Sequence, residues 1–252
     1  MMTHAITRKP GPNFADGLTT AGIGRPDHGL IVQQHDAYVY ALKNRGLFVI
    51  ELDALDAYPD AYFVEDPAVV APDVAVITIP GAPSRRGEQQ SLEEILQAHR
   101  KIERIAYPGT VDGGDVLMVG NHFFIGVSAR TNAEGARQLV EILARYGHTC
   151  TTVAVKHGLH LKSDVNYIGN NTLLTTFAFE TRTEFQNFKK ITLSKQESYA
   201  ANSMLINDCL FVPKGYPDAL SKLKQTGYDV IELDVSEVRK MDGGLTCMSL
   251  RY

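Results

Sequence analysis

Cysteine is scarce in this chain of 252 residues, which contains only Cys150, Cys209 and Cys247. An odd number of cysteines at wide spacing forms neither a disulfide framework nor a zinc-binding motif, so each cysteine needs its own explanation. Cys150 follows a helical pattern and Cys209 lies in an apolar segment. We expect both to be small buried hydrophobic residues, as most free cysteines are.

Clustered positive charge and long apolar runs are also missing. The net charge is -4 and the charged residues, 21% of the chain, are mixed in sign, which argues against a nucleic-acid-binding surface. No window approaches the ~20 apolar residues of a membrane span. Residues 1–12 are polar and lack the apolar core of a signal peptide. We therefore expect a cytoplasmic protein with no nucleic-acid or membrane partner.

Hydrophobic residues make up 44% of the chain, enough for a substantial core. Low-complexity tracts and linkers are not evident. The length fits one large domain or two small ones, and we predict a single α/β domain over residues 1–252.

One structural plan repeats along the chain, and residues 115–155 show it most clearly. Two apolar runs flank the turn pair Gly120-Asn121, which predicts a hairpin. Residues 131–134 then have capping-box spacing, apolar residues follow at helical spacing up to Gly147, and residues 151–155 form a strand. The unit is therefore ββαβ.

Similar units recur elsewhere. Strand pairs are predicted at residues 62–64 and 74–78, 165–168 and 172–175, and 203–206 and 209–212, with helices from Ser91 and Pro217 and a strand at 230–233. The last hairpin is incomplete, and a helix over residues 31–44 with a strand over 47–52 could complete it. We predict a closed ring of five such units whose final unit is shared between the two termini.

Polar residues at the first strand of each unit fall at a near-constant period. Successive anchors are 46, 48, 42 and 45 positions apart and are Asp66, Asp112, His160, Asn202 and Cys247. Such periods indicate repeated supersecondary units. If the units surround a common axis, the anchors converge on it. The alternative is that loosely similar α/β units, which are common, place them far apart.

Cys247 and His160 are the candidates for covalent and acid–base chemistry. Gly243-Gly244 allows a sharp turn just before Cys247, although a buried thiol is the commoner role. His160 lies between Leu159 and Leu161, and its imidazole could act as acid and base or be a structural core residue. His157 competes with it, and the spacing of the two histidines is a weak metal motif.

Acidic and basic residues suggest a cation site. Asp112 begins an Asp-Gly-Gly-Asp turn, which could be a tight turn or a carboxylate aimed at a cation or an imidazole. Asp60 belongs to a second acidic cluster with Glu65 and Asp66. The latter two are adjacent, so in a strand they face opposite sides and only one contacts a given ligand atom.

Two arginines and one loop complete the set of candidates. Arg85 and Arg130 could bind a carboxylate through their guanidinium forks or be plain surface charges. Residues 13–27 are rich in glycine and form either a surface loop or an active-site lid.

Together these segments resemble the dimethylarginine dimethylaminohydrolases, of the guanidino-group-modifying superfamily that includes arginine deiminases and amidinotransferases. The resemblance covers nearly the whole chain, in seven ordered motifs at residues 63–67, 83–88, 109–115, 128–132, 159–163, 197–202 and 242–250. The bacterial branch is the most similar. The family fold is a five-bladed α/β propeller, which agrees with the repeat inferred from spacing.

The resemblance implies a role for each matching residue. It implies Cys247 as nucleophile, His160 as general acid and base, and Asp112 as the carboxylate beside them. The substrate-binding residues that it implies are Leu18, Asp60, Phe63, Glu65, Asp66, Arg85, Arg130 and Met241. Among these, the carboxylates would recognise the guanidinium, the two arginines would hold the amino-acid carboxylate, and Leu18 and the Met241 backbone would contact the amino-acid end.

The implied reaction is hydrolysis of N-omega-methylated L-arginine to citrulline and a methylated amine, through a covalent S-alkylthiouronium on Cys247. It needs no metal or other cofactor. Rival functions are an arginine deiminase or another guanidino hydrolase, an amidinotransferase, a non-catalytic arginine-binding protein, and a zinc-binding thiol protein. Family members occur both as monomers and as homodimers, so either state is compatible with the resemblance.

Overall fold

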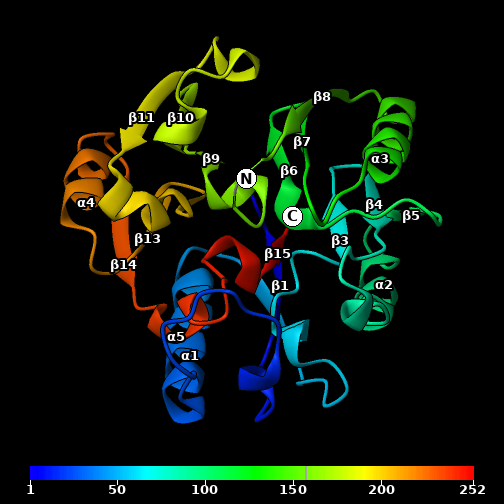
Figure 1. Ribbon diagram of the computed structural model, residues 1–252, viewed down its shortest axis with the longest axis horizontal. Helices are drawn as coiled ribbons and strands as arrows, with labels where there is room; N and C mark the ends of the chain where they lie inside the picture. Colours follow the sequence, from blue (N-terminus) through cyan, green and yellow to red (C-terminus); the bar gives the residue numbers. More distant parts are fainter. Residues whose placement is uncertain (157) are drawn as a thin grey trace.

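Five three-stranded sheets surround a common centre in the computed structural model, which describes residues 1–156 and 158–252 (Figure 1). Within the described residues, the middle strand of every sheet pairs antiparallel with one neighbour and parallel with the other. This arrangement confirms the α/β propeller of repeated units that the sequence predicts.

The strands follow the chain in order around the ring. The first sheet contains β1 (His4–Arg8), β2 (Phe48–Leu52) and β15 (Leu250–Arg251), and the second contains β3 (Ala68–Val70), β4 (Val74–Ile77) and β5 (Lys101–Arg104). The others contain β6 (Val116–Val119), β7 (His122–Val127) and β8 (Thr149–Ala154); β9 (Val165–Tyr167), β10 (Thr172–Thr176) and β11 (Lys189–Leu193); and β12 (Met204–Ile206), β13 (Cys209–Pro213) and β14 (Asp229–Leu233).

Helices on the outside of the ring connect the parallel strands (Figure 1). They are α1 (His28–Asn44), α2 (Gln90–Leu96), α3 (Ala133–Arg145) and α4 (Pro217–Lys224). The short α5 (Ser236–Arg239) follows β14 and leads toward β15 of the first sheet. Between β10 and β11 the connection consists of two 3-10 turns, Phe177–Phe179 and Thr183–Phe185. The fourth unit therefore keeps the strand plan with a reduced helical layer.

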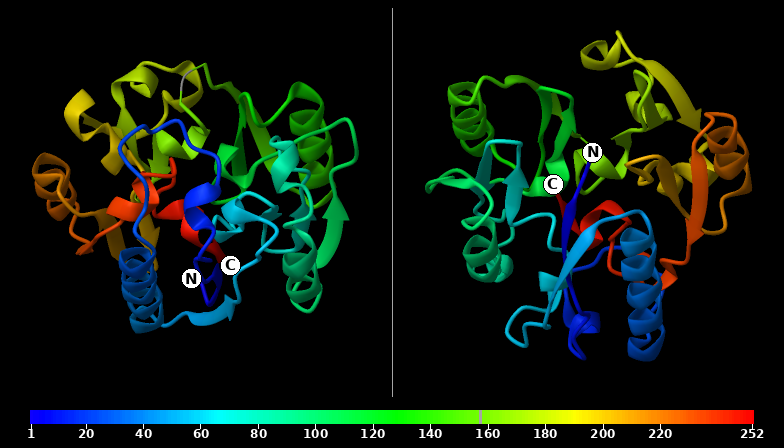
Figure 2. Two further views of the ribbon diagram at one scale, coloured as in Figure 1. Left: turned by 60° about the horizontal axis from the view of Figure 1, so that its bottom comes forward. Right: turned by 180° about the vertical axis from the view of Figure 1, so that it is seen from behind.

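The two ends of the chain share one sheet, as the incomplete last unit predicts. Ile6 of β1 pairs with Leu250 of β15, and the Thr3 amide donates to the Tyr252 carbonyl at 2.9 Å. Seen from behind, both termini lie near the middle of the molecule (Figure 2). The sequence analysis did not predict β1, because only Ala5 and Ile6 mark it as apolar within a polar segment.

The strand expected at residues 62–64 is wrong. A 3-10 turn, Pro59–Tyr62, occupies this region, and the first strand of the unit is β3. Tyr62 and Phe63 are buried all the same, with Tyr62 edge-on to Phe14 at a centroid distance of 5.1 Å. The run of apolar residues indicates that the segment is buried, but it does not distinguish a buried strand from a buried turn.

The capping box expected at residues 131–134 is wrong, because the helix begins one residue later and its N3 residue is Gly135, which has no side chain to complete a box. Asn132 is the N-cap of α3, and its side-chain oxygen accepts from the Gly135 amide at 2.7 Å. Thr131 is committed elsewhere, because its hydroxyl accepts from the Asp112 amide at 3.1 Å. A tertiary contact of the site residue Asp112 thus determines which residue begins the helix.

The hydrophobic core is divided among the interfaces between neighbouring sheets. One cluster joins Val76 of β4, Phe123 of β7 and Leu139 of α3, all buried. Burying the apolar residues between sheets leaves the ends of the first strands, near the axis, free for polar residues.

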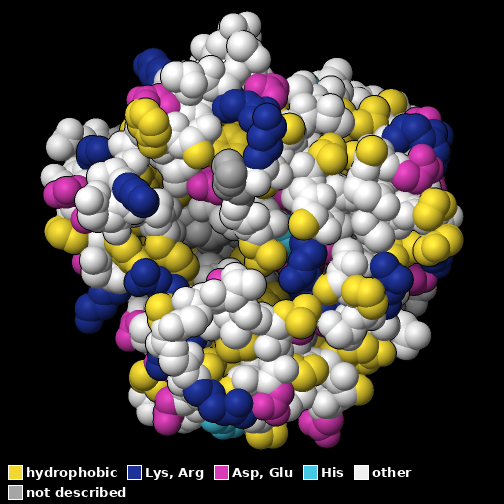
Figure 3. All heavy atoms as spheres, in the orientation of Figure 1, with side chains coloured by type: hydrophobic (Ala, Val, Ile, Leu, Met, Phe, Trp, Pro, Cys, Tyr) yellow, Lys and Arg dark blue, Asp and Glu magenta, His cyan; other side chains and the backbone are white. Residues whose placement is uncertain are grey.

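Charges of both signs are interspersed on the face drawn in Figure 3, as the sequence composition suggests. None of the helices in the described part of the chain is long and apolar enough to cross a membrane.

Candidate active site

A small pocket lies near the propeller axis and gathers most of the candidate residues. The lining residues that the sequence analysis named are Leu18, Asp60, Phe63, Asp66, Arg85, Arg130, His160, Met241 and Cys247. They come from all parts of the chain, so the convergence inferred from the repeat period is confirmed. Asp112 lies directly behind His160, and Glu65 lies outside the pocket.

The loop that carries Cys247 is pinned by Asn202. The Asn202 side chain accepts from the Thr246 amide at 3.0 Å and donates to the Thr246 hydroxyl at 3.1 Å. A Cβ atom at Gly244 would collide with that side chain, which explains the need for glycine there. The sequence analysis used Asn202 only as a repeat anchor and missed this role.

The Cys247 thiol lies in a setting that opposes ionisation. Burial, together with the nearby carboxylates Glu65 and Asp66, raises the pKa of Cys247 to about 12. A high thiol pKa in the ligand-free protein agrees with the sequence analysis, which reasoned that a carboxylate cluster makes a further anion costly. A bound cation would lower that cost.

His160 is buried against two carboxylates. Its Nε2 lies 3.0 Å from Asp112 and 3.9 Å from Asp66. Burial alone would lower the pKa of His160, but these carboxylates outweigh it and raise the pKa to about 9. The imidazole is therefore protonated at neutral pH and can donate a proton.

Close packing at the Asp-Gly-Gly-Asp turn makes this contact possible. A Cβ atom at Gly114 would lie 2.5 Å from the Nδ1 of His160, so the ring approaches the backbone where only glycine leaves room. Asp115 is structural, since its carboxylate accepts from the Leu161 amide at 2.9 Å and from the Ser128 hydroxyl at 2.6 Å.

Asp66, Asp112 and His160 could in principle hold a metal ion, because one ligand atom from each lies within 4.8 Å of the others. A metal would have to displace the proton that keeps His160 charged. The other histidine of the weak metal motif, His157, lies outside the described residues.

Arg85 lines the pocket, but contacts within the protein already engage its guanidinium. It lies 2.5 Å from Asp66 and 2.8 Å from Glu88, and it also donates to the backbone oxygens of Asp60 and Phe63. This placement favours a role in positioning the Asp66 carboxylate. It does not favour the predicted role, in which Arg85 binds the carboxylate of the substrate. Glu88 ends the family motif at residues 83–88, and burial raises its pKa to about 7.

Arg130 is better placed to bind a carboxylate. Its guanidinium lines the pocket, is 19% exposed, and lies 3.9 Å from Asp112. No shorter ion pair of Arg130 is found among the described residues.

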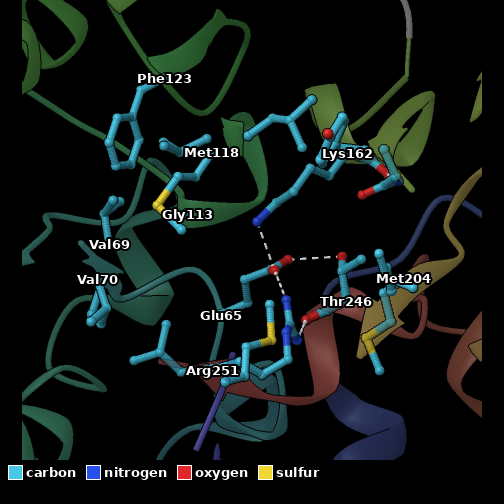
Figure 4. A pocket seen from close by; sticks show the side chains of 18 of the residues that line it. Glu65, Val69, Val70, Gly113, Met118, Phe123, Lys162, Met204, Thr246 and Arg251 are labelled. Carbon is cyan, nitrogen blue, oxygen red and sulfur yellow. Dashed lines mark hydrogen bonds and ion pairs between the residues drawn. The ribbon is translucent and has the colours of Figure 1, made fainter. Parts of the chain in front are cut away.

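Glu65 faces away from the pocket although its neighbour Asp66 lines it. Its carboxylate lies 2.6 Å from the ammonium of Lys162 and 2.9 Å from the guanidinium of Arg251, and it accepts from the Thr246 hydroxyl at 2.9 Å (Figure 4). The two acids do point to opposite sides, although they lie in a turn before β3 and not in the strand for which this was expected. Glu65 therefore supports the segment bearing Cys247, and direct contact with a ligand in the pocket is not what its position favours.

The loop 17–27 covers the pocket, which favours the lid over the plain surface loop. The Leu18 amide donates to Asp60 at 2.9 Å, and the Thr20 amide donates to Asp242 at 2.5 Å. Figure 2 (left) shows this blue loop passing across the red C-terminal segments. Asp242, missed by the sequence analysis, has a φ of +57° that places its carboxylate under the loop. Burial raises the pKa of Asp60.

The remaining two cysteines fit the expected structural role. Cys209 is fully buried in a core cluster, and Cys150 is half-buried with its pKa raised to about 11 by burial.

Known proteins resemble this chain over its full length. The family model for arginine deiminase matches residues 54–166. The N(G),N(G)-dimethylarginine dimethylaminohydrolase of Pseudomonas aeruginosa is 46% identical over 254 residues, covering 100% of both chains, and that of Streptomyces coelicolor is 36% identical over 98% of this chain and 96% of its own.

Solved structures give the same result. The dimethylarginine dimethylaminohydrolase from Pseudomonas aeruginosa, as a cysteine-to-serine mutant complexed with citrulline, superposes with a TM-score of 0.99 at 45% identity over 100% of both chains. The N-terminal domain of a cyanobacterial arginine dihydrolase shares the fold, with a TM-score of 0.89 at 17% identity over 98% of this chain and 96% of that domain. The chain therefore belongs to the dimethylarginine dimethylaminohydrolase family.

Proposed function

We propose that this protein hydrolyses N-omega-methylated L-arginines to L-citrulline and methylamine or dimethylamine. The observation that carries the proposal is the convergence of a cysteine, a protonated histidine and two carboxylates in one covered pocket. Full-length likeness to dimethylarginine dimethylaminohydrolases supports the choice of substrate. We further propose that residues 1–252 act as one domain, because the pocket takes residues from both ends of the chain.

Substrate binding follows from charge. The guanidinium is a delocalised cation and a poor electrophile, and Asp60 and Asp66 offer carboxylates that hold it and orient its central carbon. Arg130 binds the α-carboxylate of the amino acid. Leu18 and Met241 cover the amino-acid end, with Phe63 beside them.

The first half of the reaction forms the covalent intermediate. With the substrate cation bound, Cys247 loses its thiol proton to solvent, and the thiolate sulfur attacks the central guanidinium carbon. His160, held as an imidazolium by Asp112, gives its proton to the methylated nitrogen. The carbon–nitrogen bond breaks, the amine leaves, and an S-alkylthiouronium remains on Cys247.

The second half regenerates the enzyme. The now neutral His160 takes a proton from water, whose oxygen attacks the same carbon. The carbon–sulfur bond breaks, Cys247 leaves as thiolate and takes the extra proton of the ureido product, and neutral citrulline is released. This sequence consumes water alone and uses only the protein's own groups.

The test is a panel that measures citrulline from asymmetric dimethylarginine, monomethylarginine, arginine and agmatine. We expect turnover of the two methylated substrates at a kcat/KM at least tenfold above that of arginine. Arginine as preferred substrate would replace the proposal with an arginine deiminase.

The matched control is Cys247→Ser, which keeps the size of the side chain but removes the thiol. It should abolish citrulline formation while substrate still binds. Binding without turnover by the natural sequence would instead identify an arginine-binding protein.

A further inference from the structure

A second cavity lies on the other side of Glu65 from the catalytic pocket. It holds about 370 Å³, within the roughly 300–1,000 Å³ typical of small-molecule sites. Within the part of the chain that the structure describes, the two hollows share no lining residue. It is therefore a separate space.

The walls of this cavity are apolar and come from several sheets. Figure 4 shows Val69 and Val70 on one side, Phe123 and Met118 above, and Met204 opposite. Such walls favour a hydrocarbon chain, because burying it removes apolar surface from water.

The polar end of the cavity carries an excess of positive charge. Lys162 and Arg251 converge on Glu65, with side chains 12% and 13% exposed against 3% for Glu65 (Figure 4). The two side-chain cations exceed the one carboxylate, and Met1, which carries the α-ammonium, also lines the cavity, so the net charge at this apolar hollow is positive. A partly desolvated charge of this kind attracts an anion.

The ammonium of Lys162 also has unused donor capacity. Of its three N–H donors, one is accounted for by Glu65 at 2.6 Å, and no second side-chain ion pair of Lys162 is found among the described residues. A carboxylate entering the cavity can therefore bind Lys162 without breaking the existing pair.

We propose that this cavity binds a medium-chain aliphatic monocarboxylate, with its carboxylate on Lys162 and its chain against Val69, Met118 and Phe123. Arg251 is engaged with Glu65, Thr246 and Ser249 and contributes its charge. The excess positive charge matches a carboxylate, and the apolar walls match an unbranched chain. A cation of equal length is repelled, and a neutral chain gains only the apolar contact. The site is independent of the proposed reaction.

The test uses the full chain and titrates three probes of equal chain length by isothermal calorimetry. Octanoate supplies the carboxylate, octan-1-ol the neutral chain, and octyltrimethylammonium the cation. We expect saturable binding of octanoate, at least tenfold weaker binding of octan-1-ol, and no binding of the cation. Equal affinity for octanoate and octan-1-ol, or no binding of octanoate, would overturn the proposal.

Variants decide which hollow is occupied. Met118→Glu places a negative charge at an exposed position of the wall and should weaken octanoate binding at least tenfold, whereas the matched Met118→Gln should not. Lys162→Met should weaken it similarly. Arg130→Gln, in the catalytic pocket, should leave it unchanged.

Both Met118 variants should keep the basal rate and the thermal midpoint of the natural sequence, because Met118 is remote from the reacting groups. Octanoate binding that survives Met118→Glu but is lost in Arg130→Gln would locate the anion in the catalytic pocket and refute the proposal.

Discussion

At the scale of single residues, the site depends on the raised pKa values of the Cys247 thiol and the His160 imidazole. Without a bound substrate, these values leave the thiol un-ionised. Cys247 resists ionisation mainly because it is buried, and Glu65 and Asp66 add to the effect. His160 resists losing its proton because of Asp66, Asp112 and Asp115, so Asp66 contributes to both effects. The substrate supplies the missing cation. Because the thiol ionises only when the substrate is bound, it stays unreactive toward other electrophiles in the free protein.

Alkylation of Cys247 should therefore be slow and rise steeply with pH. Because the thiolate is the reactive species and the pKa of Cys247 is about 12, the rate with iodoacetamide should still be increasing tenfold per pH unit at pH 9–10. The rate is measured by mass spectrometry of the Cys247 peptide. A plateau near pH 8 would contradict this assignment.

His160 should make the fold less stable in mild alkali. Its folded pKa of about 9 lies above the ordinary value near 6.5, so its contribution is fully present below pH 6.5 and is lost as pH rises through 9. We expect the free energy of unfolding to fall by about 2–3 kcal/mol between pH 7 and 9. Urea titrations at each pH measure this.

His160→Gln is the control, since it removes the titration while keeping a polar side chain. The dependence over the same window should become nearly flat. A slope equal to that of the natural sequence would assign the effect to other groups.

At the scale of elements, short turns carry the site and the sheets hold the turns in place. Asp112 and His160 each come directly before a 3-10 turn and Cys247 lies within one, and these turns lead into β6, β9 and β15. Glycine appears where these turns touch, as at Gly114 against His160. The loop 17–27 is held over them by carboxylates, with Asp60 accepting from the Leu18 amide and Asp242 accepting from the Thr20 amide.

Removing the Asp242 carboxylate should loosen the loop 17–27. Asp242→Gly keeps the φ of +57° without strain but loses the bonds to Thr19 and Thr20. At about 1 kcal/mol for such bonds, we expect KM to rise roughly threefold to tenfold and proteolysis within residues 17–27 to accelerate. Asp242→Asn keeps one acceptor and should lie between. Unchanged proteolysis would show that Asp242 does not hold the loop.

At the scale of the whole molecule, ring closure depends on a strand of only two residues. β15 joins the end of the chain to β1. Its second residue, Arg251, also forms an ion pair with Glu65. The termini consequently lie side by side, with the Thr3 amide on the Tyr252 carbonyl.

A circular permutant should therefore fold. Joining Tyr252 to Met1 through a short glycine–serine linker, with new ends at the exposed Lys214-Gly215, keeps every sheet intact. We expect a thermal midpoint within about 5 °C of the natural order, since such a change is about 1 kcal/mol, and retained citrulline formation. Deleting residues 250–252 is the matched control and should lower the midpoint much further. A permutant that fails to fold would show that ring closure needs the natural ends.

Sequence periodicity predicted the repeated unit and a closed ring shared between the termini, because these follow from spacing along the chain. On spacing alone, the convergence of Asp66, Asp112, His160 and Cys247 was one of two alternatives, and the structure decided for it. The hairpins at 116–125 and 165–175 were predicted because their turns contain residues suited to positive φ, such as Gly120 and Asn170. Family motifs added the candidate roles.

Only the tertiary structure decided which charged groups face each other. It turned Glu65 away from the pocket toward Lys162 and Arg251, committed Arg85 to Asp66 and Glu88, and replaced the strand at 62–64 by a turn. Spacing along a chain determines which residues can meet. The direction of each side chain depends on contacts between segments far apart in sequence, which local pattern does not contain.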